Sequence, residues 1–338
     1  MTERDRVLMA LGHRAPDIVP YHLDLTDLVY RRLQEYYGDD DFFAGTGSHL
    51  AQERNESFEE VSASEFFDMF GVLWSREQKG DFGIVKNHVL KDASFGDYVF
   101  PEPDEALIRE KCARLVAQPD RFTMYIIGFS LFERAWTLRG FNEVLMDFLL
   151  EKPFANRLLD RIVEYNLKVV DIVAEYDIDC IFFGDDWGQQ RGLIMGPHLW
   201  REFILPRLRF QYDYVKGKGM YVAQHSCGDN REIFADLVDI GLDIYNTFQP
   251  EIYDVREMKR EYGGSVTFYG GISTQRLLPF GTPEDVRAET REMMDIVGKD
   301  GGFVVAPTHA IPDDVPTENI LAFLDAVKGQ DSEGRLYW

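Results

Sequence analysis

A histidine and a cysteine two residues apart form the sharpest chemical pair in the sequence. His225 and Cys227 stand at the end of an apolar run, residues 220–225, whose composition is typical of a strand. Side chains two residues apart in an extended segment point to the same side, so the imidazole and the thiol can face one point. Zinc binds these donors, and catalytic zinc sites use three protein ligands. The open alternative is that His225 hydrogen-bonds a substrate and Cys227 is a small buried side chain.

His309 is the third ligand that we predict. It follows the last apolar run of the chain, residues 302–306. A closed barrel of parallel strands brings its first and last strands together, with their carboxyl ends at one mouth. We therefore expect His225, Cys227 and His309 to bind one zinc ion in a single cleft.

Two carboxylates follow other apolar runs and are our candidates for catalytic groups. Asp185 and Asp186 come directly after residues 180–184, and only one of them is expected to face the barrel mouth, because adjacent side chains on a strand point in opposite directions. We predict Asp185 as a proton-handling or ligand-binding carboxylate, with a helix cap or an ion pair as the alternative. Glu133, after residues 122–129, is the second candidate, although it can also pair with Arg134.

Further polar and aromatic residues near the strand ends are candidates for substrate binding. His22 and Asp24 share one side of the expected first strand, residues 19–25, because they too are two residues apart. The aromatic content is 14%, and aromatic side chains at strand ends can wall an apolar ligand, although most aromatics in a barrel are core residues. The predicted substrate-binding residues are His22, Asp24, Trp187, Gln249 and Tyr269.

Short apolar runs alternate with amphipathic stretches along most of the chain, which indicates a parallel sheet with helical connections. The expected strands are residues 19–25, 122–129, 180–184, 220–225, 243–246, 266–271 and 302–306. The expected helices are residues 26–37, 155–176, 197–215, 231–241, 283–297 and 317–327. We predict a (β/α)8 TIM barrel formed by one domain, residues 1–338, with an eighth strand within residues 60–100 and an N-terminal excursion containing a hairpin of residues 70–78 and 83–90. A doubly wound sheet is less favoured, because no GxGxxG follows the first strand.

Composition restricts the classes of partner. The 338 residues carry a formal charge of -23, from 59 acidic and 36 basic residues, and such a surface repels nucleic acid. No apolar run approaches the roughly 20 residues that span a bilayer, and three cysteines give no disulfide framework. The charged N-terminus lacks the apolar centre of a signal peptide, so we expect a cytoplasmic protein without a membrane or nucleic-acid partner.

Several segments, in order, resemble one family. GDDWG at 184–188, HSCGD at 225–229, FYGGIS at 268–273 and GGFVVAPTHAIPDDVPTENI at 301–320 are similar to segments of uroporphyrinogen decarboxylases and their relatives. The resemblance implies a (β/α)8 barrel with its cleft at the carboxyl ends of the strands. True uroporphyrinogen decarboxylases carry an RQAGR segment after the first strand that grips substrate carboxylates, whereas this chain has His22 and Asp24 there. We therefore do not expect uroporphyrinogen to be the substrate of this protein.

A second branch of the superfamily, the zinc- and corrinoid-linked methyltransferases, resembles this chain in its HxC pair and in a third ligand after the last strand. That ligand is a cysteine in the branch that methylates coenzyme M, and His309 stands there in this chain. The resemblance implies a cobalamin-dependent methyltransferase that moves a methyl group between a small methoxylated or methylamine compound and a corrinoid carried by a partner protein. The alternatives are a metal-independent decarboxylase or lyase, and a non-enzymatic corrinoid- or tetrapyrrole-binding module. The oligomeric state is open, with a homodimer as one option.

Overall fold

The computed structural model describes residues 1–76 and 83–330, so residues 77–78 of the expected hairpin lie outside the described residues. The chain divides into two compact units. The first unit comprises Met1–Ala51, Gln118–Thr123 and Leu242–Trp338, and the second comprises Gln52–Ala117 and Met124–Gly241. The single domain expected from the sequence stays a prediction.

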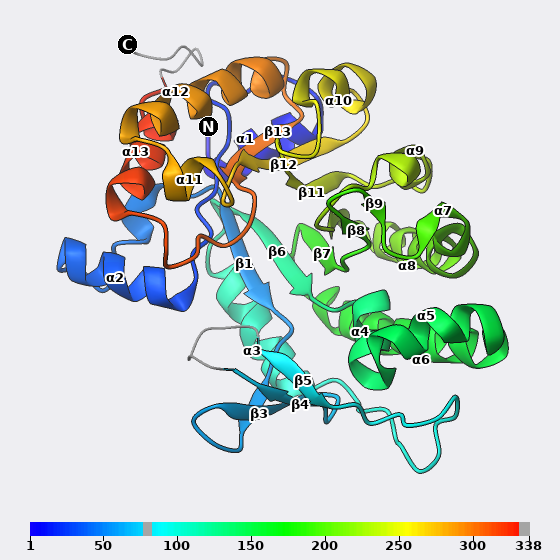
Figure 1. Cartoon of the computed structure of the whole chain (residues 1–338). Coiled ribbons are helices and arrows are strands. Elements are labelled where there is room, and N and C mark those ends of the chain that lie inside the picture. Colours follow the sequence, from blue (N-terminus) through cyan, green and yellow to red (C-terminus); the bar gives the residue numbers. More distant parts are fainter. Residues whose placement is uncertain (77–82, 331–338) are drawn as a thin grey trace. The chain divides into compact units, whose positions relative to one another are not determined.

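Parallel strands alternating with helices make up most of both units, which confirms the α/β class (Figure 1). Their order in the sheet is β1-β6-β7-β10-β11-β12-β13. Their bounds are Leu50–Arg54 (β1), Phe122–Ile127 (β6), Cys180–Gly184 (β7), Tyr221–His225 (β10), Ile244–Phe248 (β11), Thr267–Ile272 (β12) and Phe303–Pro307 (β13). These are seven strands, so the described residues do not show the eight strands of the complete barrel that we predicted.

The second unit contains β7, β10 and β6 from Met124 onward, in parallel register. Nearly every residue of β6 and β7 is buried, as expected for strands covered on both faces. Its helices are α3 (Glu105–Val116), α4 (Phe132–Arg139), α5 (Phe141–Leu150), α6 (Lys152–Val173), α7 (Gly196–Leu199), α8 (Leu205–Gly217) and α9 (Phe234–Asp239), with a π-helix at Trp200–Ile204 and a 3-10 turn at Arg231–Ile233. A small hairpin of β8 (Gly188–Gln189) and β9 (Gly192–Leu193) follows β7.

An antiparallel sheet occupies the region in which we expected the eighth barrel strand. Its four strands are β2 (Phe58–Glu60), β3 (Glu65–Asp68), β4 (Leu73–Ser75) and β5 (Ile84–Asn87). The pairing of β4 with β5 confirms the expected hairpin. The expectation of an eighth barrel strand here was wrong, because these short strands pair with one another rather than with a parallel neighbour.

The first unit contains β11, β12 and β13 in parallel register. The expected first strand, residues 19–25, forms only two isolated parallel bridges, Tyr21 with Val305 and Leu25 with Ile311. This segment therefore runs along β13 and the loop after it without becoming a continuous strand. Strand β1, which begins at Leu50, is not among the strands predicted from the sequence.

The helices of the first unit are α1 (Glu3–Leu11), α2 (Asp27–Tyr37), α10 (Val255–Tyr262), α11 (Leu277–Phe280), α12 (Pro283–Met293) and α13 (Thr317–Lys328), with a 3-10 turn at Ala44–Thr46 and a π-helix at Met294–Gly298. Local sequence explains where α12 begins: Thr282 accepts a hydrogen bond from the backbone of Asp285, and Pro283 occupies the first turn. Helices α12 and α13 pack against each other, in orange and red in Figure 1.

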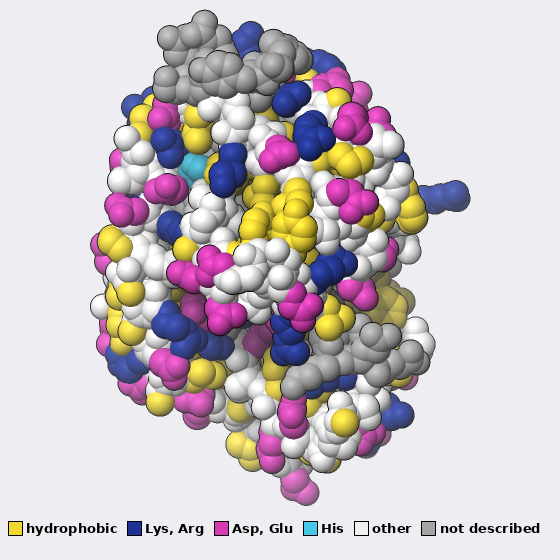
Figure 2. All heavy atoms as spheres, turned by 90° about the vertical axis from the view of Figure 1, so that its left-hand side faces the viewer, with side chains coloured by type: hydrophobic (Ala, Val, Ile, Leu, Met, Phe, Trp, Pro, Cys, Tyr) yellow, Lys and Arg dark blue, Asp and Glu magenta, His cyan; other side chains and the backbone are white. Residues whose placement is uncertain are grey.

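Charged side chains of both signs are scattered over the face that Figure 2 shows, with hydrophobic side chains between them. Among the described residues, no helix has both the length and the apolar character that crossing a bilayer requires.

Candidate functional site

The register of two neighbouring strands brings the candidate ligands together. In the second unit, β10 pairs with β7 so that His225 lies opposite Gly184. The pairing continues one residue further, since the backbone N–H of Asp185 donates to the carbonyl oxygen of His225 at 3.0 Å. Asp186 and Cys227 each lie two residues beyond that registered pair, so they are neighbours at the strand spacing of about 4.8 Å. The carboxyl ends of β7 and β10 therefore carry one shared site.

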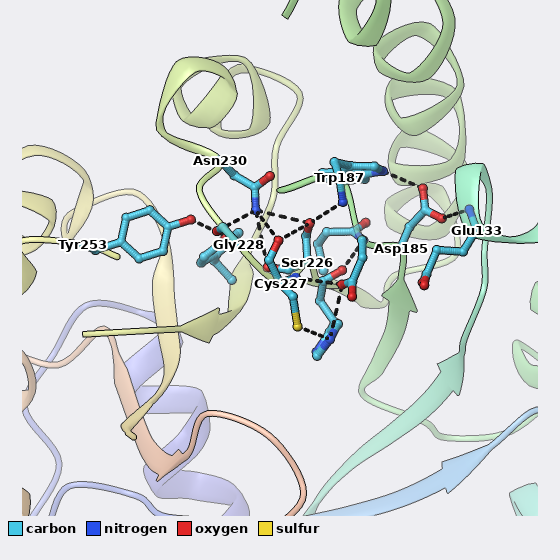
Figure 3. A network of polar contacts seen from close by, with 12 residues as sticks. Glu133, Asp185, Trp187, Ser226, Cys227, Gly228, Asn230 and Tyr253 are labelled. Carbon is cyan, nitrogen blue, oxygen red and sulfur yellow. Dashed lines mark hydrogen bonds and ion pairs between the residues drawn. The ribbon is translucent and has the colours of Figure 1, made fainter. Parts of the chain in front are cut away.

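Three different donor types meet at these strand ends (Figure 3). The Cys227 Sγ lies 3.5 Å from the His225 Nε2, and the Asp186 Oδ1 lies 3.6 Å from the same nitrogen. Cys227 and the side chains of His225 and Asp186 are all partly exposed. Tetrahedral zinc with its usual bond lengths places ligands about 3.3–3.8 Å apart, so this cluster has dimensions that suit the ion.

Asp185, the predicted catalytic carboxylate, is fully buried and holds the beginning of α4. Its oxygens accept hydrogen bonds from the backbone N–H groups of Leu131, Phe132 and Glu133, at 3.2, 3.0 and 2.8 Å. The indole N–H of Trp187 donates to the same carboxylate. An acidic group at a helix N-terminus is stabilised by the orphan amides there. Burial nevertheless raises the pKa of Asp185 to about 6.

Glu133 is the second predicted catalytic residue, and its surroundings favour the protonated form. Burial raises the pKa of its carboxyl group well above the usual value, and the negative charges of Asp186 and Asp185 raise it further. The backbone N–H of Asp186 donates to the Glu133 carboxylate and opposes this shift in part. Glu133 can therefore hold a proton close to the Asp186–His225–Cys227 cluster.

Two residues next to the candidate ligands in the chain, Ser226 and Trp187, are buried in the protein. Ser226 is buried and accepts a hydrogen bond from the backbone N–H of Trp187 at 3.0 Å. Trp187, a predicted substrate-binding residue, is fully buried against Trp200, with ring centroids 5.4 Å apart. From this position the indole N–H of Trp187 donates to the Asp185 carboxylate. A contact between Trp187 and a substrate stays a prediction.

The other predicted site residues belong to the first unit. His22 is buried, with its Nδ1 2.5 Å from the Ser48 Oγ, and its ring meets that of Tyr269 edge to face, with centroids 6.1 Å apart. Gln249 is buried directly after β11. Asp24 and His309 are half-buried, and His309 lies in the loop after β13. Thus, of the three predicted zinc ligands, His225 and Cys227 lie together in the second unit, and His309 lies in the first.

Asp186 lies beside the HxC pair, although its neighbour Asp185 was the aspartate predicted for the site. The alternation rule predicted that only one of two adjacent aspartates faces the site. The hydrogen bonds of Asp185 to α4 show which aspartate turns away.

Parallel strands joined by helices, with nitrogen, sulfur and oxygen donors at the carboxyl ends of β7 and β10, place this chain in the α/β class. Within this class the chain belongs to the uroporphyrinogen decarboxylase (URO-D) family, whose model matches residues 77–330.

Individual relatives carry two different names. The methylated-thiol–coenzyme M methyltransferase of Methanosarcina mazei is 24% identical over 174 residues, which are 52% of this chain and 44% of that protein. The match thus spans less than half of the length of that relative. The uroporphyrinogen decarboxylase of Psychromonas ingrahamii is 22% identical over 265 residues, 74% of this chain and 72% of that protein.

Among solved structures, a methyltransferase from Methanosarcina mazei has a TM-score of 0.75 at 18% identity, with 97% of this chain and 98% of that chain covered. At this identity the likeness establishes a shared fold.

Proposed function

We propose that this protein is a methyltransferase that moves a methyl group between a small methoxylated or methylamine compound and a corrinoid carried by a partner protein. The observation that carries the proposal is the cluster of Asp186, His225 and Cys227, whose ligand atoms all lie within 4.8 Å of one another. The similarity to a methylated-thiol–coenzyme M methyltransferase supports the same reaction class.

The donor set fits a catalytic zinc ion. An imidazole, a thiolate and a carboxylate are all ligands of zinc, and three protein ligands leave the fourth position open for a substrate. Bound there, zinc supplies a Lewis acid for the heteroatom from which the methyl group departs. A set with one thiolate is harder than a set with two, which suits an oxygen or nitrogen donor better than a thiol. His309 stays a predicted ligand, as an alternative to Asp186 that keeps the number of protein ligands at three.

Two carboxylates of the second unit have different parts in the proposed reaction. Glu133, whose pKa is raised by burial and by its acidic neighbours, would donate a proton to the departing oxygen or nitrogen. Asp185 binds the backbone N–H of Glu133 and so fixes the first turn of α4, from which the Glu133 side chain extends. Asp185 is thus a positioning residue.

The test combines metal content with methyl transfer. Elemental analysis of the purified protein is expected to give about one zinc per chain, and methoxylated aromatics or methylamines should convert cob(I)alamin to methylcobalamin, measured by absorbance. His309→Ala should lower zinc affinity if His309 is a ligand and leave it unchanged if the second unit alone holds the ion. A metal-free wild-type protein that still methylates cob(I)alamin would contradict the zinc site.

The decarboxylase relatives support one alternative, a metal-independent carboxy-lyase on another carboxylated substrate. Glu133 would then be the proton donor to the product carbanion. Release of carbon dioxide by metal-free protein, without any effect of zinc, would favour this function over methyl transfer.

A further inference from the structure

We infer that a close backbone crossing between Gly188 and Gly228 sets the geometry of the metal ligands before any metal binds. This inference rests on the proposed zinc site. It concerns two segments of the second unit, the one after β7 that carries Asp186 and the one after β10 that carries Cys227.

Steric contacts at the crossing leave no room for a side chain. A Cβ atom added to Gly188 would lie 2.6 Å from the carbonyl oxygen of Cys227 and 2.7 Å from the backbone nitrogen of Asp229. A Cβ atom added to Gly228 would come even closer to the backbone of Gly188, and Gly228 also has a φ of 81°. Backbone atoms cannot move aside as a flexible side chain can, so only glycine permits this approach.

Hydrogen bonds on both sides of the crossing join the same two segments. The backbone N–H of Cys227 donates to the Asp186 Oδ1 at 2.7 Å, and that of Asp229 donates to the carbonyl oxygen of Gln189 at 2.9 Å. The Ser226 hydroxyl accepts from the backbone N–H of Trp187 across the two segments at 3.0 Å, and from the side-chain amide of Asn230 within its own segment at 3.2 Å (Figure 3). The two segments are therefore joined at consecutive positions around the ligands.

The bonds and the close crossing hold Asp186 and Cys227 in place. Ligands that are already in place lose little conformational freedom when the metal binds, and supporting groups of this kind tune affinity strongly. Gly188 and Ser226 touch no ligand side chain in the contacts described above. They act through the backbone, so they are positioning residues.

The test uses Gly188→Ala with Gly217→Ala as the matched control. Gly217 also lies in the second unit, at the end of α8, and an added Cβ there meets nothing within 4 Å. Cobalt(II) titration followed by absorbance reports both affinity and four-coordinate thiolate geometry. We expect G188A to lower cobalt affinity by about 10- to 100-fold and to weaken the four-coordinate bands, while G217A matches wild type.

A second variant keeps the inference testable if G188A does not fold. Ser226→Ala removes one acceptor without adding atoms, and Ser130→Ala is its control, since the Ser130 hydroxyl is buried and has no hydrogen-bond partner among the described residues. S226A should weaken cobalt binding and S130A should not. If G188A and S226A both have the cobalt affinity and spectra of the wild type, the inference is overturned. If G188A is unfolded, wild-type cobalt affinity and spectra in S226A overturn it. Absence of metal binding in the wild type would instead overturn the proposed zinc site.

Discussion

The Oδ1 of Asp186 accepts a hydrogen bond of 2.7 Å from the backbone N–H of Cys227. This bond joins two residues 41 positions apart in the chain, and it places a carboxylate beside the HxC pair. Neither spacing along the chain nor residue type alone identifies such a neighbour, because it depends on the register of β7 with β10.

Replacing Cys227 by Ala should remove most of the bound zinc and the methylation of cob(I)alamin. The thiolate is the sulfur donor of the cluster, and Cys227 is half-buried, so its loss leaves the core intact. Elemental analysis and a methylcobalamin assay measure the two effects. Cys112→Ala is the control, because Cys112 is buried in α3 and should not affect zinc content. Full zinc content in C227A would exclude this thiolate as a ligand.

The neighbouring aspartates should respond differently to replacement by asparagine. Asp186→Asn weakens a ligand and should lower zinc affinity by about 10- to 100-fold with little change in stability, since that side chain is partly exposed. Asp185→Asn removes charged hydrogen bonds from the N-terminus of α4 and should cost about 1–3 kcal/mol in the free energy of unfolding. Urea unfolding and chelator competition separate the two effects. Equal zinc affinities in the two variants would contradict the assigned orientations.

Glu133→Gln should lower kcat while zinc content stays at the wild-type level. Burial and the charges of Asp186 and Asp185 raise the pKa of Glu133, so the carboxyl group keeps its proton to higher pH than usual, and activity should fall as pH rises through that pKa. Glutamine resembles the protonated acid in shape but transfers no proton, and a loss of about 10²- to 10⁴-fold is expected. The pH profile of E133Q should lack the basic limb of the wild-type profile. An unchanged profile would show that another group donates the proton.

His49 should make the protein sensitive to acid. Burial lowers the pKa of His49 to about 3, and its ring packs edge to face on Tyr21. The unfolded chain has the higher pKa, about 6.5, so it binds the proton first and stability is lost as pH falls below that value. Each pH unit between the two pKa values costs about 1.4 kcal/mol.

His49→Phe removes this titration and keeps an aromatic ring. Urea unfolding at pH 7, 5.5 and 4.5 should therefore show a smaller loss of stability in H49F than in wild type. The control is His198→Gln, because His198 is exposed on α7. Identical slopes of stability against pH in H49F and wild type would refute the contribution of His49.

The sequence by itself determined the α/β class and the meeting of His225 with Cys227. Apolar runs of strand length alternate with helical stretches, and a strand presents residues two apart on one side. The start of the helix at Pro283 could also be predicted from the sequence, because the Thr282 cap and the proline act on neighbouring residues only.

Only the tertiary structure decided which aspartate joins the HxC pair. Both candidates are chemically identical, and the choice depends on the N-terminus of α4, whose amides bind Asp185 and leave Asp186 beside Cys227. The same limit explains the wrong expectation for residues 60–100, where short alternating segments fit a barrel strand or a hairpin equally well. Strand pairing partners and side-chain orientation are fixed by contacts between distant segments, which periodicity along the chain does not contain.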